Sequence, residues 1–258
     1  MAKISKFERK LIRERNRIEI KGQKLAFKAI KKQYKVIFDR LKIFSPQFVL
    51  DNLNVPEKPV KEFMLDYYSM FAPIGVITRN QALKNKNIED DYFDNKFMER
   101  LRQFALIETG ANVTSITETT EKFIRGAIES AITQATEEGL GADKTARLIR
   151  TYLQDSLGDI GVSRAKTIAR TEMTVGSNTA SQYGIDSTGL EYRKFWSNSG
   201  LPNIRDSHIF AQDNYPNGIG KDELFDMGNG NLMRHVGDPS GPPEEVINCR
   251  CTTLYSVI

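Results

Sequence analysis

The pattern of apolar and polar positions predicts a mainly helical chain that ends in a short region of strands. Apolar residues recur at three and four residue steps, the spacing of amphipathic helices, in six stretches. These cover residues 27–44, 60–71, 88–109, 114–137, 143–153 and 164–184. The expected breaks between them are Ser45-Pro46, Pro73 with Gly75, Gly110, and Gly158 with Gly161. Short breaks between helices favour antiparallel neighbours in a bundle.

The helix expected at 164–184 has an unusual face, and Ser163 and Gly184 are its expected ends. Small and apolar residues recur along this face, which indicates that another element packs closely against it. They are Ala165, Ile168, Ala169, Gly176, Ala180 and Tyr183. Glu172 falls on the same face, and a buried carboxylate requires a cation or several donors. We expect a structural polar core of Glu172 with Arg205, His208 and Arg250.

After Gly184 the period changes to that of strands. Residues 190–196 and 249–258 alternate between apolar and polar positions, which is typical of half-buried strands. Asp206 is placed to start a short helix that carries His208, and residues 213–243 are rich in Gly, Asn, Asp and Pro, as loops are.

The predicted fold is therefore a mainly α protein, a helical bundle with an extended N-terminal helix, followed by a small C-terminal α+β module. We expect a basic amphipathic helical arm at 1–45, a helical domain at 46–186 and the α+β module at 187–258.

Composition narrows the class of protein. The chain has 258 residues, 40% hydrophobic and 27% charged, as in ordinary soluble proteins. Its apolar runs are far shorter than the ~20 residues that span a bilayer, so we expect no membrane partner. The N-terminus is charged where a signal peptide would be apolar. We therefore expect the protein to act in the compartment that makes it, the cytoplasm, or to leave it as part of an assembly.

Charge is unevenly distributed. Residues 1–42 contain 15 Lys or Arg and 4 Asp or Glu, a net charge of +11, whereas the rest of the chain contains 22 and 29, a net charge of −7. Such an excess of one sign indicates an acidic partner, either a phosphate backbone or a negatively charged protein surface. The expected contact residues are Lys6, Arg9, Lys10, Arg13, Arg15, Arg17, Lys21, Lys24, Lys28, Lys31 and Lys32.

The cysteines, Cys249 and Cys251, are separated by one residue. That spacing disfavours a disulfide on an extended segment, so we expect reduced thiols. With His208 and His235 they offer the ligand types that zinc takes. A second closely spaced ligand pair is missing from the sequence, so we expect neither a metal nor a cofactor. If a metal were bound, His208, Cys249 and Cys251 would be the candidate ligands.

Several motifs occur in a fixed order along the second half of the chain. They are Arg164-Ala-x-x-Ile-Ala-Arg-Thr-Glu172, Trp196, Arg205-x-Ser-His208, Gly237-Asp-Pro239 and Pro243-Glu-Glu-Val-Ile-Asn-Cys-Arg-Cys251. This series resembles the Mu F-like phage head morphogenesis family, the minor head proteins of tailed phages. The resemblance covers roughly the last hundred and forty residues. It implies a structural, non-catalytic minor capsid protein in the virion, in the head interior near the portal, whose partners are the portal protein and other head proteins. The charge of the N-terminal arm independently suggests phage genomic DNA as a further partner.

Two other functions are compatible with parts of the sequence. The first is an enzyme carried in the head, either a metal-dependent hydrolase built on His208, Cys249 and Cys251 or a toxin-like transferase using Glu172 and Arg170. Those last two residues project nearly opposite one another on a helix, which disfavours a shared pocket. The second is a nucleic-acid-binding protein without a virion role, which would leave the C-terminal motifs unexplained.

Overall fold

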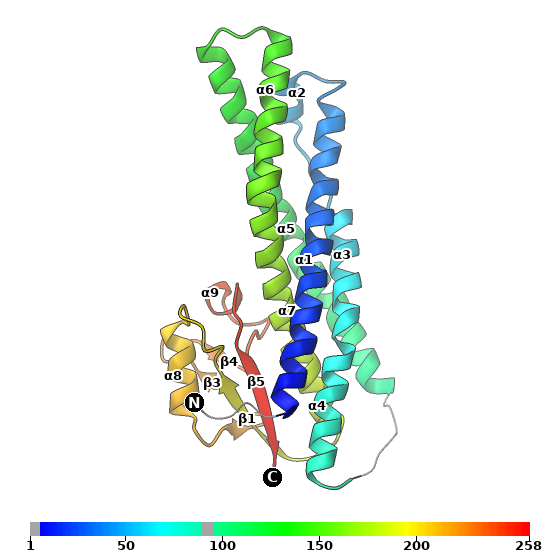
Figure 1. The fold of residues 1–258 in the computed structure, drawn as a ribbon, viewed down its shortest axis with the longest axis vertical. Coiled ribbons are helices and arrows are strands. Elements are labelled where there is room, and N and C mark those ends of the chain that lie inside the picture. The colour runs from blue at the N-terminus through cyan, green and yellow to red at the C-terminus, as the bar shows by residue number, and fades with distance from the viewer. Residues whose placement is uncertain (1–5, 89–94) are drawn as a thin grey trace. The chain divides into compact units, whose positions relative to one another are not determined.

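The computed structural model describes residues 6–88 and 95–258 (Figure 1). Within these ranges the protein is mainly helical, with a small antiparallel sheet near the C-terminus, which confirms the predicted fold class. The helices are α1 (Lys6–Arg40), α2 (Pro46–Asp51), α3 (Lys58–Tyr68), η1 (Ser69–Phe71), α4 (Ala72–Asn85), α5 (Asn95–Glu137), α6 (Ala142–Asp155), the π-turn η2 (Ser156–Ile160), α7 (Gly161–Asp186), α8 (Asp206–Asn214) and α9 (Pro243–Val246). None of the helices in these ranges is long and apolar enough to cross a membrane.

The chain forms two compact units, and each contains several chain segments. Unit 1 consists of Met1–Gly22, Tyr67–Ala105 and Thr167–Ile258, and unit 2 of Gln23–Asp66 and Leu106–Lys166. This division differs from the predicted one, because the boundaries fall inside α1, α3, α5 and α7. The N-terminal arm is therefore not a separate part: its first half belongs to one unit and its second half to the other.

In unit 1, two helices approach each other at glycines. A Cβ on Gly184 would lie 2.2 Å from the carbonyl oxygen of Gly75, and a Cβ on Gly176 would lie 2.3 Å from the Phe71 ring. These contacts explain the small residues of α7, whose close packing was predicted. Leu11 and Ile18 of α1 are also buried in this unit, so the first turns of the helix contribute to a core.

The sheet of unit 1 has the strand order β2-β1-β5, with both pairings antiparallel. The strands are β1 (Tyr192–Ser197), β2 (Ile219–Gly220) and β5 (Thr252–Val257), while β3 (Phe225–Asp226) and β4 (Leu232–Met233) form a separate two-stranded pair. Tyr192, Lys194 and Trp196 share the buried face of β1, as the alternation predicted.

Unit 2 buries the second half of α1, with Ile30, Tyr34 and Ile37 at most 1% exposed. Polar side chains join its helices: Tyr34 Oη lies 2.8 Å from Ser156 Oγ, and Arg164 donates to Thr120 Oγ1 at 3.0 Å. The apolar seam that begins at Phe27 thus fixes this half of the helix.

Several predicted helix ends are wrong, among them Ser163 and Gly184, which both lie inside α7 (Gly161–Asp186). Pro73 lies in the first turn of α4, where its missing N–H costs nothing. Gly110 lies inside α5, which continues to Glu137, and residues 89–94 of the predicted helix fall outside the described ranges. Gly158 belongs to the π-turn that carries α6 into α7, so the expected break there is a wide helical turn.

Candidate functional site

Polar side chains of α7 hold the Asn248-Cys-Arg-Cys251 segment in unit 1. Thr171 Oγ1 accepts from Asn248 N at 2.9 Å, and Thr174 Oγ1 donates to Cys249 O at 2.6 Å. One helical turn later, Asn178 Oδ1 accepts a backbone N–H of β5 at 2.9 Å. These α7 residues thus supply hydrogen-bond partners for backbone groups at and beside a turn. The helix that carries the Arg-Thr-Glu motif therefore seats the cysteine segment.

Arg15 of α1 holds the other side of this segment. Its Nη2 donates to Cys251 O at 3.0 Å, its Nε lies 3.4 Å from Met173 Sδ, and its Nη1 contacts Thr252 Oγ1. The side chain is buried, and this burial lowers the pKa of Arg15 to about 10, so the guanidinium stays charged at neutral pH. Arg15 is therefore a structural cation and not the exposed contact residue that its position in a basic run predicted.

The predicted polar core is distributed over separate contacts. Arg250 Nη2 lies 3.3 Å from the carboxylate of Glu19, which also lies 3.4 Å from Arg170 Nε. The carboxylate that Arg250 meets therefore comes from α1, which the sequence had suggested to be an independent arm. Arg205 Nη2 donates to the carbonyl oxygen of residue 247.

Glu172 is buried, as predicted, and accepts a hydrogen bond from Tyr68 Oη at 2.6 Å.

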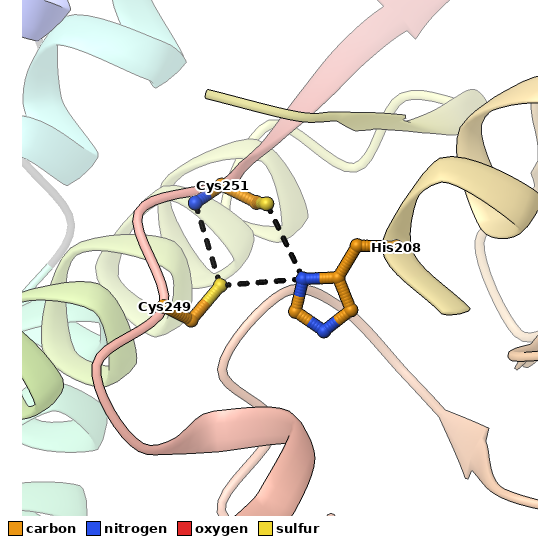
Figure 2. A group of neighbouring side chains, drawn as sticks. All are labelled: His208, Cys249 and Cys251. Atoms are coloured by element: carbon orange, nitrogen blue, oxygen red, sulfur yellow. Dashed lines mark hydrogen bonds between the residues drawn. The ribbon is translucent and has the colours of Figure 1, made fainter. Parts of the chain in front are cut away.

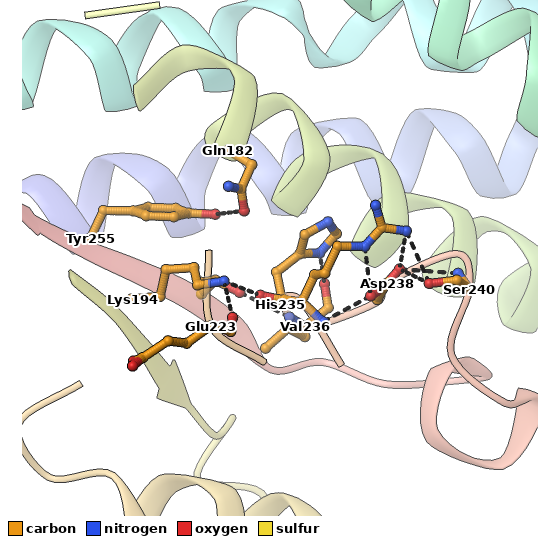
Figure 3. Close-up of polar contacts among 10 residues, drawn as sticks. Gln182, Lys194, Glu223, His235, Val236, Asp238, Ser240 and Tyr255 are labelled. Atoms are coloured by element: carbon orange, nitrogen blue, oxygen red, sulfur yellow. Dashed lines mark hydrogen bonds and ion pairs between the residues drawn. The ribbon is translucent and has the colours of Figure 1, made fainter. Parts of the chain in front are cut away.

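Hydrogen bonds to charged groups contribute roughly 1.5–3 kcal/mol. Tyr68→Phe is expected to lower the free energy of unfolding by about 2 kcal/mol, as measured by guanidinium denaturation. Tyr255→Phe is the matched control, because its hydroxyl lies 3.5 Å from the neutral Gln182 (Figure 3). Equal losses in the two variants would contradict a charged acceptor for Tyr68.

His208, Cys249 and Cys251 converge in unit 1 (Figure 2). His208 Nδ1 lies 3.4 Å from Cys251 Sγ and 3.6 Å from Cys249 Sγ. Both cysteines are free and buried. Asn248 has a positive φ of 61°, which asparagine tolerates better than most residues. After this turn the alternate positions 249 and 251 project toward the same imidazole, which comes from α8.

Glu245 orients the histidine of this cluster. Its Oε2 lies 2.9 Å from His208 Nε2, and the carboxylate also accepts from Ser207 Oγ, Asn229 Nδ2 and Asn231 Nδ2. Burial by itself raises the pKa of Glu245, but these hydrogen bonds outweigh it and hold the pKa below its ordinary value. An ionised carboxylate accepts the Nε2 proton, and in a neutral imidazole the Nδ1 lone pair then faces both sulfurs.

The two thiols differ in acidity. The hydrogen bond with Cys251 lowers the pKa of Cys249, to which the contact with His208 adds. The same contact between the thiols raises the pKa of Cys251, as does its burial. Cys249 is therefore the more acidic thiol of the pair.

An open cleft with a volume of about 250 Å³ adjoins the cluster. His208, Cys249 and Cys251 all line it, together with Arg170, Arg205 and Arg250. The cleft therefore brings three cationic side chains close to the cluster.

A second polar cluster fixes the loop before α9, and His235 lies in it (Figure 3). Buried Lys194 of β1 donates from Nζ to Glu223 O at 2.7 Å and to Arg234 O at 2.9 Å. The Asp238 carboxylate accepts from the backbone and side chain of Arg234. His235 Nδ1 lies 3.0 Å from Val236 O, so this histidine serves the loop and not the cysteines.

Ten of the eleven predicted contact cations of α1 are exposed; the exception is Arg15. In unit 1, cations recur at three and four residue steps at Lys6, Lys10, Arg13, Arg17 and Lys21. In unit 2 the spacing continues at Lys24, Lys28, Lys31 and Lys35. We call these nine residues the basic stripe. Lys35 was not among the predicted contacts, although the three and four residue spacing of the cations indicates it.

Sequence reasoning missed Glu19, Glu245, Asn229 and Asn231. Glu245 lies in the Pro243-Glu-Glu-Val motif, and nothing in the sequence around it indicates that it lies close to His208. Glu19 looked like one acid in a basic helix, and its burial follows from tertiary packing alone.

Comparisons with protein-family models, curated proteins and solved structures found no match for this chain.

Proposed function

We propose that this protein is a structural minor head protein of a tailed bacteriophage, acting in head morphogenesis in the head interior near the portal. The order of the motifs on α7, α8 and the Asn248-Cys-Arg-Cys251 segment supports this proposal through its resemblance to the Mu F-like family. The residues of those motifs hold the C-terminal module together, as expected of an assembly piece. Its partners would be the portal protein and other head proteins, and it would be made in the host cytoplasm.

The basic stripe is the observation that supports a contact with DNA. Its five cations in unit 1 lie along about 22 Å of helix, and all are exposed while Leu11 and Ile18 on the same helix are buried. Duplex DNA presents one negative charge per about 1.7 Å of its axis. A rigid helix that displays cations at regular intervals fits such a surface without base-specific contacts.

The proposed DNA contact is tested by measuring how the full chain binds duplexes of unrelated sequence over a salt series. Binding is expected to be independent of sequence and to weaken steeply between about 50 and 200 mM salt. Absence of binding at the lowest salt would overturn the DNA contact and direct attention to an acidic protein surface, such as that of a portal.

A further inference from the structure

We propose that His208, Cys249 and Cys251 bind a zinc ion, with Nδ1 and the two Sγ atoms as ligands. These three atoms all lie within 4.8 Å of one another. Zinc–sulfur and zinc–nitrogen bonds of about 2.3 and 2.0 Å in tetrahedral geometry place a sulfur and a nitrogen ligand about 3.5 Å apart. The observed distances from Nδ1 to the two sulfurs, 3.4 and 3.6 Å, match this value.

The equal placement of both sulfurs favours a metal over a metal-free ion pair. A thiolate paired with an imidazolium accounts for one short sulfur contact to Nδ1, whereas here both sulfurs approach the same nitrogen (Figure 2). Two thiolates and a divalent cation also form a neutral unit, and pairing lowers the cost of burying charged groups. All three side chains are at most 3% exposed.

The surroundings of His208 are those of a metal-ligating histidine. Such histidines donate their second ring nitrogen to a carboxylate or carbonyl, which fixes the tautomer and the ring orientation. Glu245 fulfils this role at 2.9 Å, and three further donors hold its carboxylate. Glu245 is thus a positioning residue that acts through His208.

The zinc would join α8 to the Asn248-Cys-Arg-Cys251 segment. Because all three ligands line the cleft, we assign the fourth tetrahedral position to solvent that enters through it. This site is independent of the DNA contact, since the basic stripe shares none of its residues.

Zinc content is the first test. The full chain, expressed with added zinc and purified without chelator, is expected to contain about one zinc per chain. The double variant Cys249→Ser with Cys251→Ser should lose it. Arg250→Ala, which changes the residue between the cysteines and leaves both thiols, should retain it. Less than roughly a tenth of an equivalent in the wild type, or unchanged zinc in the double variant, would overturn the proposal.

Cobalt(II) substitution tests the site without relying on a variant that folds. Cobalt bound to the wild-type chain is expected to show thiolate-to-metal absorption in the near ultraviolet and the strong visible bands of tetrahedral geometry. Glu245→Gln should weaken zinc binding about 10- to 100-fold while leaving those bands in place at saturating cobalt. A cobalt spectrum no stronger than that of the hydrated ion would overturn the proposal whatever the DNA experiments show.

Discussion

Replacing the cations of the basic stripe that lie in unit 1 with Gln is expected to abolish most DNA binding. The substituted residues are Lys6, Lys10, Arg13, Arg17 and Lys21. Each phosphate contact contributes about −0.9 to the slope of log affinity against log salt. The slope is therefore expected to become shallower by about 4 to 5, as measured by fluorescence anisotropy over a salt series.

A control with the same change in net charge separates the stripe from overall charge. It replaces five exposed cations outside α1 with Gln, namely Lys58, Lys61, Lys122, Lys144 and Arg150. This variant is expected to keep most of the slope. Equal losses in both variants would show that net charge alone drives binding, and an unchanged slope in the stripe variant would place the contact elsewhere. Substitution is preferable to deleting the helix, because Leu11 and Ile18 are buried.

Gly184→Ala is expected to destabilise unit 1 by about 3 kcal/mol, as overpacking against a rigid neighbour does. The added Cβ would lie 2.2 Å from Gly75 O and 2.9 Å from Gly75 Cα. Both are backbone atoms, so relief requires α4 and α7 to move apart. Guanidinium denaturation at an unchanged m-value measures the loss.

Gly110→Ala is the matched control within α5. Apart from the backbone of α5 itself and the neighbouring residues, nothing lies within 4 Å of the position that its Cβ would take, so alanine adds helix propensity at no steric cost. It is expected to stabilise the protein by about 0.5–1 kcal/mol. If the two substitutions changed the free energy of unfolding in the same direction, the close approach of Gly184 to Gly75 would not control stability.

The sequence was informative where a signal is local. The strand at Tyr192–Ser197 and the small face of α7 follow from alternation and spacing, and the short helix with His208 begins at Asp206, as expected. Helix ends were harder to predict from the sequence. Glycine disfavours helices on average, yet α5 continues through Gly110, because Thr109 and Val113 beside it are buried in packing contacts.

The candidate site was harder to predict, because its parts are distant in the chain. His208 and the cysteines were recognised as possible ligands, but a second close ligand pair was expected of a metal site. Glu245 supplies the orientation of His208 that sequence spacing could not reveal. Arg15 was assigned to the basic surface because charge in a sequence does not distinguish an exposed cation from a buried one.

The contact of Arg15 with Cys251 has a consequence for the order in which the protein is completed during synthesis. The donor leaves the ribosome well before the acceptor, which lies 236 positions later. Unit 2 ends at Lys166, so all of its residues are available while the cysteine segment is still being translated. Unit 1 cannot be completed before that segment has been made, because Arg15 donates to Cys251 O only in the folded unit. Translation thus sets the earliest time at which the cysteine segment can be locked in place.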